Sequence, residues 1–295
     1  MGSCHVCKVS KDKLKSCVCR KVSYCSKECQ TEDWKAHRSS CPIYVIRESP
    51  GKGRGFFATR KIKKGQIILE EYPLLVLEQG PSLPAFQTNV FPNIDEETKT
   101  KILQLFDPAE NFRNLESRTV KELFRKNPRM SLYKEALSAS DEMSRIWRIF
   151  LYNAISTCGE PDLYSNQLEM SLYNFSLLNH CCVPNVVQSW VIGDYRRRQL
   201  RALRDIEKDE EILTAYCPTQ EFVYGTRDFR RQKLLETSAF LCECSVCSLE
   251  GEDLEENERI REEIRDKERE IDQLMNFGSN VRIVPLSSVH LLRQA

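Results

Sequence analysis

The chain has 295 residues, of which 41% are hydrophobic and 29% charged, and a formal net charge of +1. This length allows one large domain or roughly two to three small ones. No run of about 18 apolar residues occurs and the N-terminus has no apolar signal-peptide core, so we expect neither a membrane span nor secretion. The near-zero net charge gives no general reason to expect nucleic-acid binding.

The fourteen cysteines are clustered rather than spread along the chain. Seven lie in the first 41 residues, three lie within Cys242–Cys247, and four are scattered through 158–217. Because the chain has no secretory signal, this clustering of cysteines favours metal binding over disulfides.

The N-terminal segment supplies eight potential soft or imidazole ligands, which suffice for two tetrahedral zinc sites. They are Cys4, Cys7, Cys17, Cys19, Cys25, Cys29, His37 and Cys41. Residues 32–38 predict a helical turn, which would place His37 and Cys41 on one face. So small a segment cannot bury a sufficient core, and zinc would therefore supply much of its folding free energy. The alternative is a set of free cysteines in a reduced core.

This segment resembles a MYND zinc finger in its spacing and in the run Tyr24-Cys25-Ser26-Lys27-Glu28-Cys29 before Asp33-Trp34 and His37. The resemblance implies two cross-braced zinc sites, one held by Cys4, Cys7, Cys25 and Cys29 and the other by Cys17, Cys19, His37 and Cys41. The middle Cys-x-Cys pair is shorter than the Cys-x-x-Cys of many MYND fingers. The resemblance also implies a Pro-rich peptide or corepressor as partner. The local lysines predict a solvated face more than a nucleic-acid patch, which leaves nucleic acid as an open alternative.

Residues 51–58 read Gly-Lys-Gly-Arg-Gly-Phe-Phe-Ala, a glycine-rich turn followed by an apolar run. Glycines let the backbone approach a ligand closely. The full G-x-G-x-x-G context is missing and no clear helix follows, so a dinucleotide-binding site is disfavoured. Ile67–Leu77, broken by Pro73, predicts a buried pair of strands.

Within residues 81–157 the apolar residues recur at helical spacing. Asp141 stands just before this pattern, where it can cap the helix. The apolar stripe repeats at i, i+3, i+4 and i+7 over Met143, Ile146, Trp147, Phe150, Leu151, Ala154 and Ile155. The pattern predicts a core-facing helix in which Trp147 packs rather than forms a site.

The run 174–185 ends in Asn179-His180 and a Cys-Cys-Val-Pro-Asn turn, after an apolar stretch too short for most helices. Paired amide and imidazole groups after a buried strand predict a ligand-contacting corner. Val186–Val191 and Gln199–Leu203 then predict strands, and the Arg196–Arg198 run a solvated hairpin edge.

Two stretches resemble the signatures of SET-domain protein methyltransferases. Residues 179–185 are similar to the Asn-His-Ser-Cys-x-Pro-Asn motif, with Cys181 in place of Ser and Val183 where Asp is common. Residues 209–216 resemble a Gly-Glu-Glu-(Leu/Ile)-x-x-x-Tyr run, with Asp209 in place of Gly. The resemblance implies an α+β fold, a SET β-fold of several small sheets with a pseudo-knot and a helical insert. It further implies that Tyr216 is catalytic and that S-adenosylmethionine (SAM) is bound by Lys52, Arg54, Asn153, Asn179, His180 and Phe240.

Cys242, Cys244 and Cys247 leave one zinc ligand missing, and Cys182 is the natural fourth. The resemblance implies a post-SET zinc here, which makes three zinc ions in all and brings Phe240 toward the adenine. Cys158, Cys181 and Cys217 are left as ordinary buried thiols. Family members often carry a second active-site tyrosine shortly before these cysteines, where this chain has Thr237-Ser238-Ala239.

Residues 251–275 are charged and carry a narrow apolar stripe of Ile260, Ile264, Ile271 and Leu274, which predicts an amphipathic helix. The whole chain is then organised in six parts: a MYND finger (1–42), the N-terminal part of SET (43–80), a helical insert (81–157), the C-terminal part of SET (158–220), a post-SET zinc segment (221–250) and a charged C-terminal tail (251–295).

Two functions stay open. The first is SAM-dependent N-methylation of a lysine in a histone or non-histone protein, in transcriptional regulation, with a location in nucleus and cytoplasm. The second is an inactive or weakly active zinc-dependent scaffold or corepressor. The missing second tyrosine favours the scaffold, whereas Asn179-His180 and Tyr216 favour the enzyme.

Overall fold

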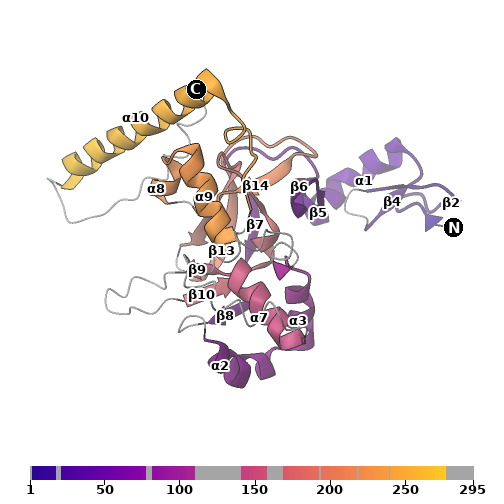
Figure 1. The fold of residues 1–295 in the computed structure, drawn as a ribbon. Helices are drawn as coiled ribbons and strands as arrows, with labels where there is room; N and C mark the ends of the chain where they lie inside the picture. Colours follow the sequence, from indigo (N-terminus) through magenta and orange to yellow (C-terminus); the bar gives the residue numbers. More distant parts are fainter. Residues whose placement is uncertain are drawn as a thin grey trace.

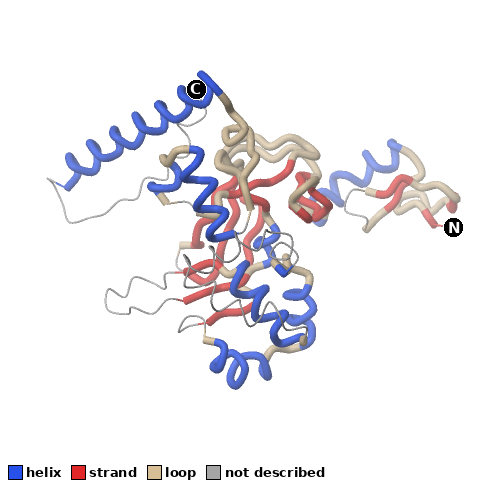
Figure 2. The backbone as a smooth tube through the Cα atoms, in the orientation of Figure 1, coloured by secondary structure: helices blue, strands red, loops and turns tan. Residues whose placement is uncertain are grey.

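The structure is a computed structural model, and it describes residues 2–17, 21–77, 82–109, 141–157, 169–192, 194–217, 219–238 and 240–276. Of the predicted site and thiol residues, Cys19 and Cys158 lie outside these ranges. Short strands gather in the middle of the molecule with helices around them, and the N-terminal finger lies to one side (Figure 2). Within the described ranges, no helix has both the length and the apolar character that a bilayer span requires.

The finger consists of two small hairpins and one helix: β1 (Gly2–Ser3), β2 (Ser10–Lys11), β3 (Lys15–Ser16), β4 (Ser23–Tyr24) and α1 (Lys27–Ser40). The Ser26 side chain caps α1 by accepting the Cys29 N–H at 3.3 Å. The helical turn predicted at 32–38 is confirmed as part of α1. The finger is joined to the core where Thr59 donates to the Pro42 carbonyl at 2.7 Å.

A four-stranded sheet in the order β11-β14-β6-β5 carries the middle of the fold (Figure 1). Its strands are β5 (Tyr44–Ser49), β6 (Gly53–Ala58), β11 (Asn179–His180) and β14 (Glu211–Thr214). The short β11 runs parallel to β14, and the other neighbours are antiparallel. Phe56 and Ile212, which are wholly buried, pair across β6 and β14 and anchor the sheet in the core. This sheet therefore brings the glycine-rich turn, the Asn-His corner and the Glu-Glu signature side by side.

Two three-stranded sheets complete the β structure, in the orders β8-β10-β9 and β12-β13-β7. Their strands are β7 (Ile67–Glu71), β8 (Leu75–Leu77), β9 (Ile155–Thr157), β10 (Glu169–Leu172), β12 (Val186–Val191) and β13 (Asp194–Ala202). The two strands predicted within 67–77 are present on either side of Pro73, but they do not pair with each other, because β7 pairs with β13 and β8 with β10. Pro73 lies between the two strands and cannot donate to a ladder, so the chain leaves one sheet and enters the other.

The arginine run 196–198 is not the solvated hairpin edge that the sequence predicts. It lies in β13, the central strand of its sheet, and Arg198 is only 5% exposed. The Arg198 guanidinium lies 4.6 Å from the Trp190 ring and 5.7 Å from the Tyr173 ring. A planar guanidinium can be buried in this way because it stacks on aromatic faces, which charge patterning does not reveal.

The helical insert lies in the lower half of the view in Figure 1, with α3 and α7 at the height of β8 and with α2 beneath them. Its described elements are α2 (Leu83–Ala85), a π-helical turn (Phe86–Val90), a 3-10 turn (Phe91–Asn93), α3 (Glu96–Leu103) and α7 (Glu142–Asn153). Asp141 accepts the Ser144 N–H at 2.9 Å, as predicted for the cap of α7. Trp147 is wholly buried with its ring centroid 4.9 Å from that of Phe86, which confirms its packing role. The α+β prediction of several small sheets with a helical insert is thus confirmed, while the predicted domain boundaries stay predictions.

Ion pairs of Asp107 with Arg145 and Arg148 hold the end of the 104–109 segment against α7, and the pair with Arg148 is the shorter one. Arg148 makes two bonds of 2.7 Å to the Asp107 carboxylate, with side chains 7% and 21% exposed. Burial by itself raises the pKa of Asp107, but the Arg148 hydrogen bond and the Ala109 N–H outweigh it and hold the pKa below its usual range. The pair therefore stabilises the fold above about pH 4, and this contribution is lost as the pH falls through the lowered pKa.

We expect Asp107→Asn to lower the free energy of unfolding by about 2–3 kcal/mol at pH 7, because it leaves a nearly buried guanidinium without its counter-charge. Urea denaturation measures this loss, and the difference from the unsubstituted chain should shrink below about pH 4. Glu256→Gln is the matched control, because its partner Arg259 is 57% exposed and surface pairs contribute about 0–1 kcal/mol. Equal small losses in both variants would contradict the prediction.

The C-terminal part consists of α8 (Gln220–Val223), α9 (Arg227–Ser238) and the long α10 (Gly251–Asn276). The predicted helix is confirmed, and Ile260 and Ile264 of its apolar stripe are partly buried, whereas Ile271 is 48% exposed. The most buried residue of the stretch is charged: Arg261 is 1% exposed and donates to the Val223 carbonyl at the end of α8. Terminal helix carbonyls have no partner within their helix, so an arginine from another element can satisfy them.

Candidate functional site

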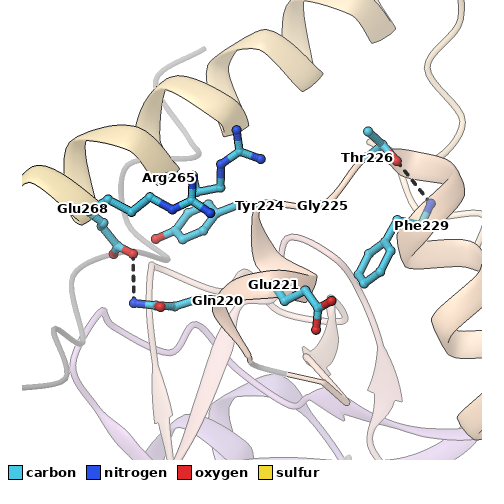
Figure 3. A pocket seen from close by; sticks show the side chains of 9 residues that line it. Gln220, Glu221, Tyr224, Gly225, Thr226, Phe229, Arg265 and Glu268 are labelled. Atoms are coloured by element: carbon cyan, nitrogen blue, oxygen red, sulfur yellow. Dashed lines mark hydrogen bonds between the residues drawn. The ribbon is translucent and has the colours of Figure 1, made fainter. Parts of the chain in front are cut away.

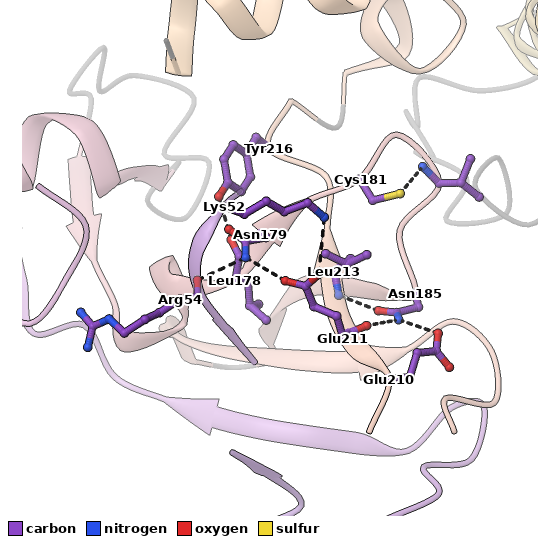
Figure 4. A network of polar contacts seen from close by, with 11 residues as sticks. Lys52, Arg54, Leu178, Asn179, Cys181, Asn185, Glu210, Glu211, Leu213 and Tyr216 are labelled. Atoms are coloured by element: carbon purple, nitrogen blue, oxygen red, sulfur yellow. Dashed lines mark hydrogen bonds and ion pairs between the residues drawn. The ribbon is translucent and has the colours of Figure 1, made fainter. Parts of the chain in front are cut away.

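Four polar groups meet where β6, β11 and β14 lie side by side (Figure 4). The Asn179 amide donates to Glu211 Oε1 at 2.8 Å and to the Arg54 carbonyl at 3.2 Å. Lys52 Nζ lies 3.4 Å from Glu211 Oε2, and Lys52 is 44% exposed. The arrangement presents an ammonium, a carboxylate and a carboxamide together, a set that suits a ligand with a free amino-acid end.

Glu211 is the centre of this group, although the sequence pointed to it only as part of a signature. It contacts both Lys52 and Asn179, which precede it in the chain by 159 and 32 residues. The Gly55 position explains how these groups approach so closely. A Cβ at residue 55 would lie 2.5 Å from Glu211 Oε1 and 2.7 Å from Asn179 Nδ2, so only glycine leaves room for this pair.

The turn after Asn179-His180 is held by the buried side chain of Asn185. Its amide donates to the Glu211 carbonyl at 2.7 Å, and its Oδ1 accepts the Leu213 N–H at 2.7 Å. The Asn185 carbonyl accepts the Leu203 N–H at 2.9 Å. Residues 179–185 are thereby tied to 203–214.

The Tyr216 hydroxyl donates to the Leu178 carbonyl at 2.8 Å, and the residue is 38% exposed (Figure 4). Burial of the phenol raises the pKa of Tyr216 well above its usual range, and the negative charge of Glu211 adds to this. The phenol is therefore protonated at neutral pH. Since its proton is engaged by a carbonyl, the oxygen can accept a hydrogen bond but cannot act as a strong base.

His180 and Phe240 border Tyr216. The ring centroid of His180 lies 5.3 Å from that of Tyr216, and the centroid of Phe240 lies 6.1 Å from it. Burial lowers the pKa of His180 to about 4, to which the positive charges of Arg230 and Lys52 also contribute. The ring is neutral at pH 7, and its Nδ1 accepts the Tyr216 N–H at 3.1 Å.

Two other residues predicted to contact the cofactor are directed toward the 104–106 segment. The Arg54 guanidinium donates to the Gln104 carbonyl, and the Asn153 amide donates to the Phe106 carbonyl at 2.8 Å. The Asn153 carbonyl accepts the Ser176 hydroxyl at 3.0 Å, which links α7 to the turn before Leu178. The structure thus groups Lys52 and Asn179 around Glu211, with only the main chain of Arg54 beside them. It groups His180 and Phe240 around Tyr216, and the Asn153 side chain belongs to neither group.

The finger contains two groups of closely spaced ligand atoms. The first consists of Cys4, Cys7, Cys25 and Cys29, and the described members of the second are Cys17, His37 and Cys41. The sulfurs of Cys17 and Cys41 are 3.7 Å apart, as are those of Cys25 and Cys29. A tetrahedral zinc ion with Zn–S bonds of about 2.3 Å spaces its sulfurs about 3.8 Å apart, whereas a disulfide needs about 2.05 Å. The geometry therefore fits zinc, and both groups match the sets that the finger resemblance implies.

A third group, here termed the C-terminal cysteine cluster, consists of Cys182, Cys242, Cys244 and Cys247. Its Cys182 sulfur lies 3.9 Å from that of Cys242 and 3.5 Å from that of Cys247, which again fits a tetrahedral ion. The wholly buried Arg230 lies 3.8 Å from the Cys247 sulfur. Its positive charge favours a thiolate there, which is the form that binds zinc.

The two cysteines that the sequence left as ordinary thiols differ in burial. Cys181 is 7% exposed and its sulfur accepts the Val183 N–H at 3.4 Å. Cys217 is only half-buried, with its sulfur 3.9 Å from the Thr237 hydroxyl. The buried-thiol prediction therefore describes Cys181 better than Cys217.

A hollow of ≈ 500 Å³ lies between α8, the start of α9 and α10 (Figure 3). Arg265 and Glu268 of α10 face Tyr224 and Gln220 across it, and Glu268 accepts from Gln220 at 3.3 Å. None of the predicted catalytic, cofactor or metal residues lines this hollow. We therefore place the candidate site at Glu211 and Tyr216 and not at this cavity.

Comparison with known proteins agrees with this geometry. The SET domain family model matches residues 53–217, and the MYND finger model matches residues 4–41. The chain therefore belongs to the SET domain family. Within that family it is a SET-and-MYND protein, with the finger N-terminal to the SET domain.

Curated relatives match most of the chain at low identity. The human N-lysine methyltransferase SMYD2 is 25% identical over 281 residues, which cover 94% of this chain and 58% of that protein. The Histone-lysine N-methyltransferase SMYD3 of Mus musculus is 26% identical over 279 residues, which cover 92% of this chain and 58% of that protein. The chain thus spans a little over half the length of the curated relatives that it matches.

Proposed function

We propose that this protein is a SAM-dependent protein-lysine N-methyltransferase with a MYND finger for protein partners. The observation that carries the proposal is the pairing of two groups on one sheet, the Lys52–Glu211–Asn179 cradle and the Tyr216 hydroxyl beside it. The relatives named as lysine methyltransferases support the same reaction class. A protein lysine is the proposed acceptor, on a histone or another protein.

The residues of the cradle fit SAM, whose amino-acid end carries an ammonium and a carboxylate. Glu211 and the Asn179 side chain would face the ammonium, and the exposed Lys52 would face the carboxylate. Phe240 is placed to border the bound molecule, since its ring lies beside both Tyr216 and His180. SAM supplies an activated methyl group when bound, so the protein needs no covalent intermediate.

The acceptor must attack as a neutral amine. Free lysine has a pKa of about 10.4, so deprotonation at pH 7 costs about 4–5 kcal/mol. A channel lined by aromatic rings lowers this cost because it disfavours the ammonium. The Tyr216 oxygen can accept an N–H of the amine and orient its lone pair, since the Leu178 carbonyl already takes the phenolic proton.

Three zinc ions per chain are proposed, two in the finger and one in the C-terminal cysteine cluster. Support comes from the sulfur spacings and, for the finger, from the MYND match. Cys19 would complete the second finger site. The finger is proposed to bind a Pro-rich peptide or corepressor, in a protein of nucleus and cytoplasm that acts in transcriptional regulation.

A second candidate is an inactive scaffold that uses the same zinc sites. One observation favours it: Thr237 and Ser238 stand where family members often carry a second active-site tyrosine. Calorimetric titration of SAM into zinc-loaded protein, followed by methyl transfer to peptide arrays, tests both candidates. Micromolar binding with transfer to lysine supports the enzyme, and no binding by folded protein that retains its zinc supports the scaffold.

Gly55→Ala is expected to raise the Kd for SAM about 10- to 100-fold while the protein stays folded. The new methyl group would meet Glu211 and Asn179 at 2.5 and 2.7 Å and push apart the pair that forms the cradle. Calorimetry measures the Kd. Gly65→Ala is the control: its φ of +81° makes alanine strained by about 1–2 kcal/mol, but nothing lies within 4 Å of its Cβ. An unchanged Kd in Gly55→Ala would contradict the cradle.

A further inference from the structure

His180 and Asn179 are neighbours in β11 and point in opposite directions, as successive strand residues do. The Asn179 side chain faces Glu211 and the Arg54 carbonyl. His180 faces Tyr216 on one side and the C-terminal cysteine cluster on the other. The adjacent pair therefore connects two different parts of the site.

Both ring nitrogens of His180 are engaged. Nδ1 accepts the Tyr216 backbone N–H at 3.1 Å, and a ring nitrogen that accepts carries no proton. The proton of the neutral ring is then on Nε2, which lies 3.4 Å from the Cys182 sulfur. One tautomer satisfies both contacts, with Nε2–H as donor to the sulfur. The side chain of His180 is thus directed away from the cradle, so its predicted contact with SAM would be made by its main chain.

The ring is held in place by three aromatic neighbours from three segments of the chain. Its centroid lies 5.3 Å from Tyr216, 5.7 Å from Phe222 and 6.0 Å from Phe240. Only 4% of His180 is exposed. A ring so enclosed cannot rotate without displacing its neighbours, so its two hydrogen bonds act as one rigid link.

The sulfur that His180 contacts belongs to a cluster whose geometry fits zinc. Groups that donate hydrogen bonds to metal ligands orient them, and their loss typically lowers metal affinity or activity about 10- to 100-fold. Arg230 is a second donor to the same cluster, through the Cys247 sulfur at 3.8 Å. His180 differs from Arg230 because its other nitrogen reaches the backbone of the candidate catalytic tyrosine.

We propose that His180 is a positioning residue that ties the backbone of Tyr216 to the Cys182 ligand of the C-terminal cysteine cluster, so that the metal site determines where the Tyr216 hydroxyl lies. The consequence for catalysis rests on the proposed function, in which Tyr216 orients the acceptor amine. The link itself does not depend on that function. It can be measured without substrate.

Two conservative variants separate the two hydrogen bonds in the full chain. His180→Gln places an amide N–H where Nε2–H donates to Cys182 and removes the acceptor for Tyr216. His180→Asn places an oxygen where Nδ1 accepts the Tyr216 N–H and removes the donor to Cys182. The readouts are the rate of zinc release to a chelator and the fluorine NMR signal of a fluorinated tyrosine at position 216. SAM affinity and methyl transfer are measured in parallel.

We expect His180→Gln to retain zinc within about 2-fold of the unsubstituted rate, but to shift and broaden the signal of residue 216. Its kcat should fall about 10- to 100-fold, while the Kd for SAM changes less than about 3-fold. We expect His180→Asn to release zinc about 10-fold faster and also to broaden the signal of residue 216. Tyr173→Phe, which removes the hydrogen bond to the Arg196 carbonyl but neither bond of His180 nor any ring around it, should leave zinc release and the signal unchanged.

The inference is overturned if the signal of residue 216 is unchanged in either His180 variant, or if His180→Asn retains zinc as the unsubstituted chain does. These results are distinct from failure of the proposed function. If the unsubstituted chain transfers no methyl group, the fluorine and zinc readouts still decide whether His180 links the two sites.

Discussion

Tyr216→Phe is expected to lower the rate of methyl transfer to lysine about 100-fold or more, while the Kd for SAM changes less than about 3-fold. The phenol is the one group of Tyr216 that can orient the acceptor amine, and its hydrogen bond to the Leu178 carbonyl fixes the direction of its lone pairs. Positioned proton-transfer and orienting groups typically contribute about 10²–10⁴-fold. Single-turnover kinetics with a lysine peptide and SAM calorimetry measure the two quantities.

Tyr173→Phe is the matched control for this prediction. The Tyr173 hydroxyl also donates to a backbone carbonyl, that of Arg196 at 2.9 Å, and the residue is wholly buried and takes no part in the hydrogen bonds of the cradle. Loss of the Tyr173 hydroxyl should lower the free energy of unfolding by about 1 kcal/mol and leave turnover within about 2-fold of the unsubstituted chain. Equal turnover in Tyr216→Phe and the control would remove Tyr216 from the proposed mechanism.

Cys182→Ser is expected to remove one zinc ion per chain and to destabilise the C-terminal part of the protein. The remaining three sulfurs cannot close a tetrahedral thiolate site, and Arg230 is left buried without the charge that it faces. Structural zinc in small domains contributes about 10–16 kcal/mol of binding free energy at pH 7, so the loss of one ligand should be large. SAM binding should be lost together with the zinc, because Phe240 lies just before this cluster.

Metal analysis, thermal unfolding and SAM calorimetry of the same preparation test this second prediction. Cys217→Ser is its control, because Cys217 follows Tyr216 directly but belongs to none of the three ligand groups of the described residues. A Cys182→Ser protein with the full zinc content would show that Cys182 is not a ligand.

The two predictions also separate the two candidate functions. A scaffold would lose zinc and stability in Cys182→Ser just as an enzyme would, because the cluster is part of the fold in either case. Only an enzyme has a turnover that Tyr216→Phe can lower. A turnover that falls in Tyr216→Phe therefore indicates the enzyme. Loss of zinc and stability in Cys182→Ser, in a protein with no measurable turnover, indicates the scaffold.

The sequence by itself determined the features that depend on local spacing. The ligand groups of the finger follow from short intervals between cysteines and His37, because a zinc ion selects sulfur and imidazole groups at such intervals. The helix at 142–153 follows from its apolar period and the Asp141 cap. The Asn-His and Glu-Glu signatures indicated the family, which the family models then matched.

Tertiary structure alone decided how these parts meet. The sequence did not single out Glu211 as the centre of the cradle, nor Gly55 as the residue that leaves room for it, because the two lie far apart in the chain and meet only through sheet pairing. It also assigned Arg198 wrongly and gave no sign that Arg261 of α10 is buried. Burial of an arginine depends on aromatic rings or free carbonyls that distant segments supply, and no local pattern records those partners. Long-range packing, rather than residue type, therefore placed the groups that the proposed chemistry needs.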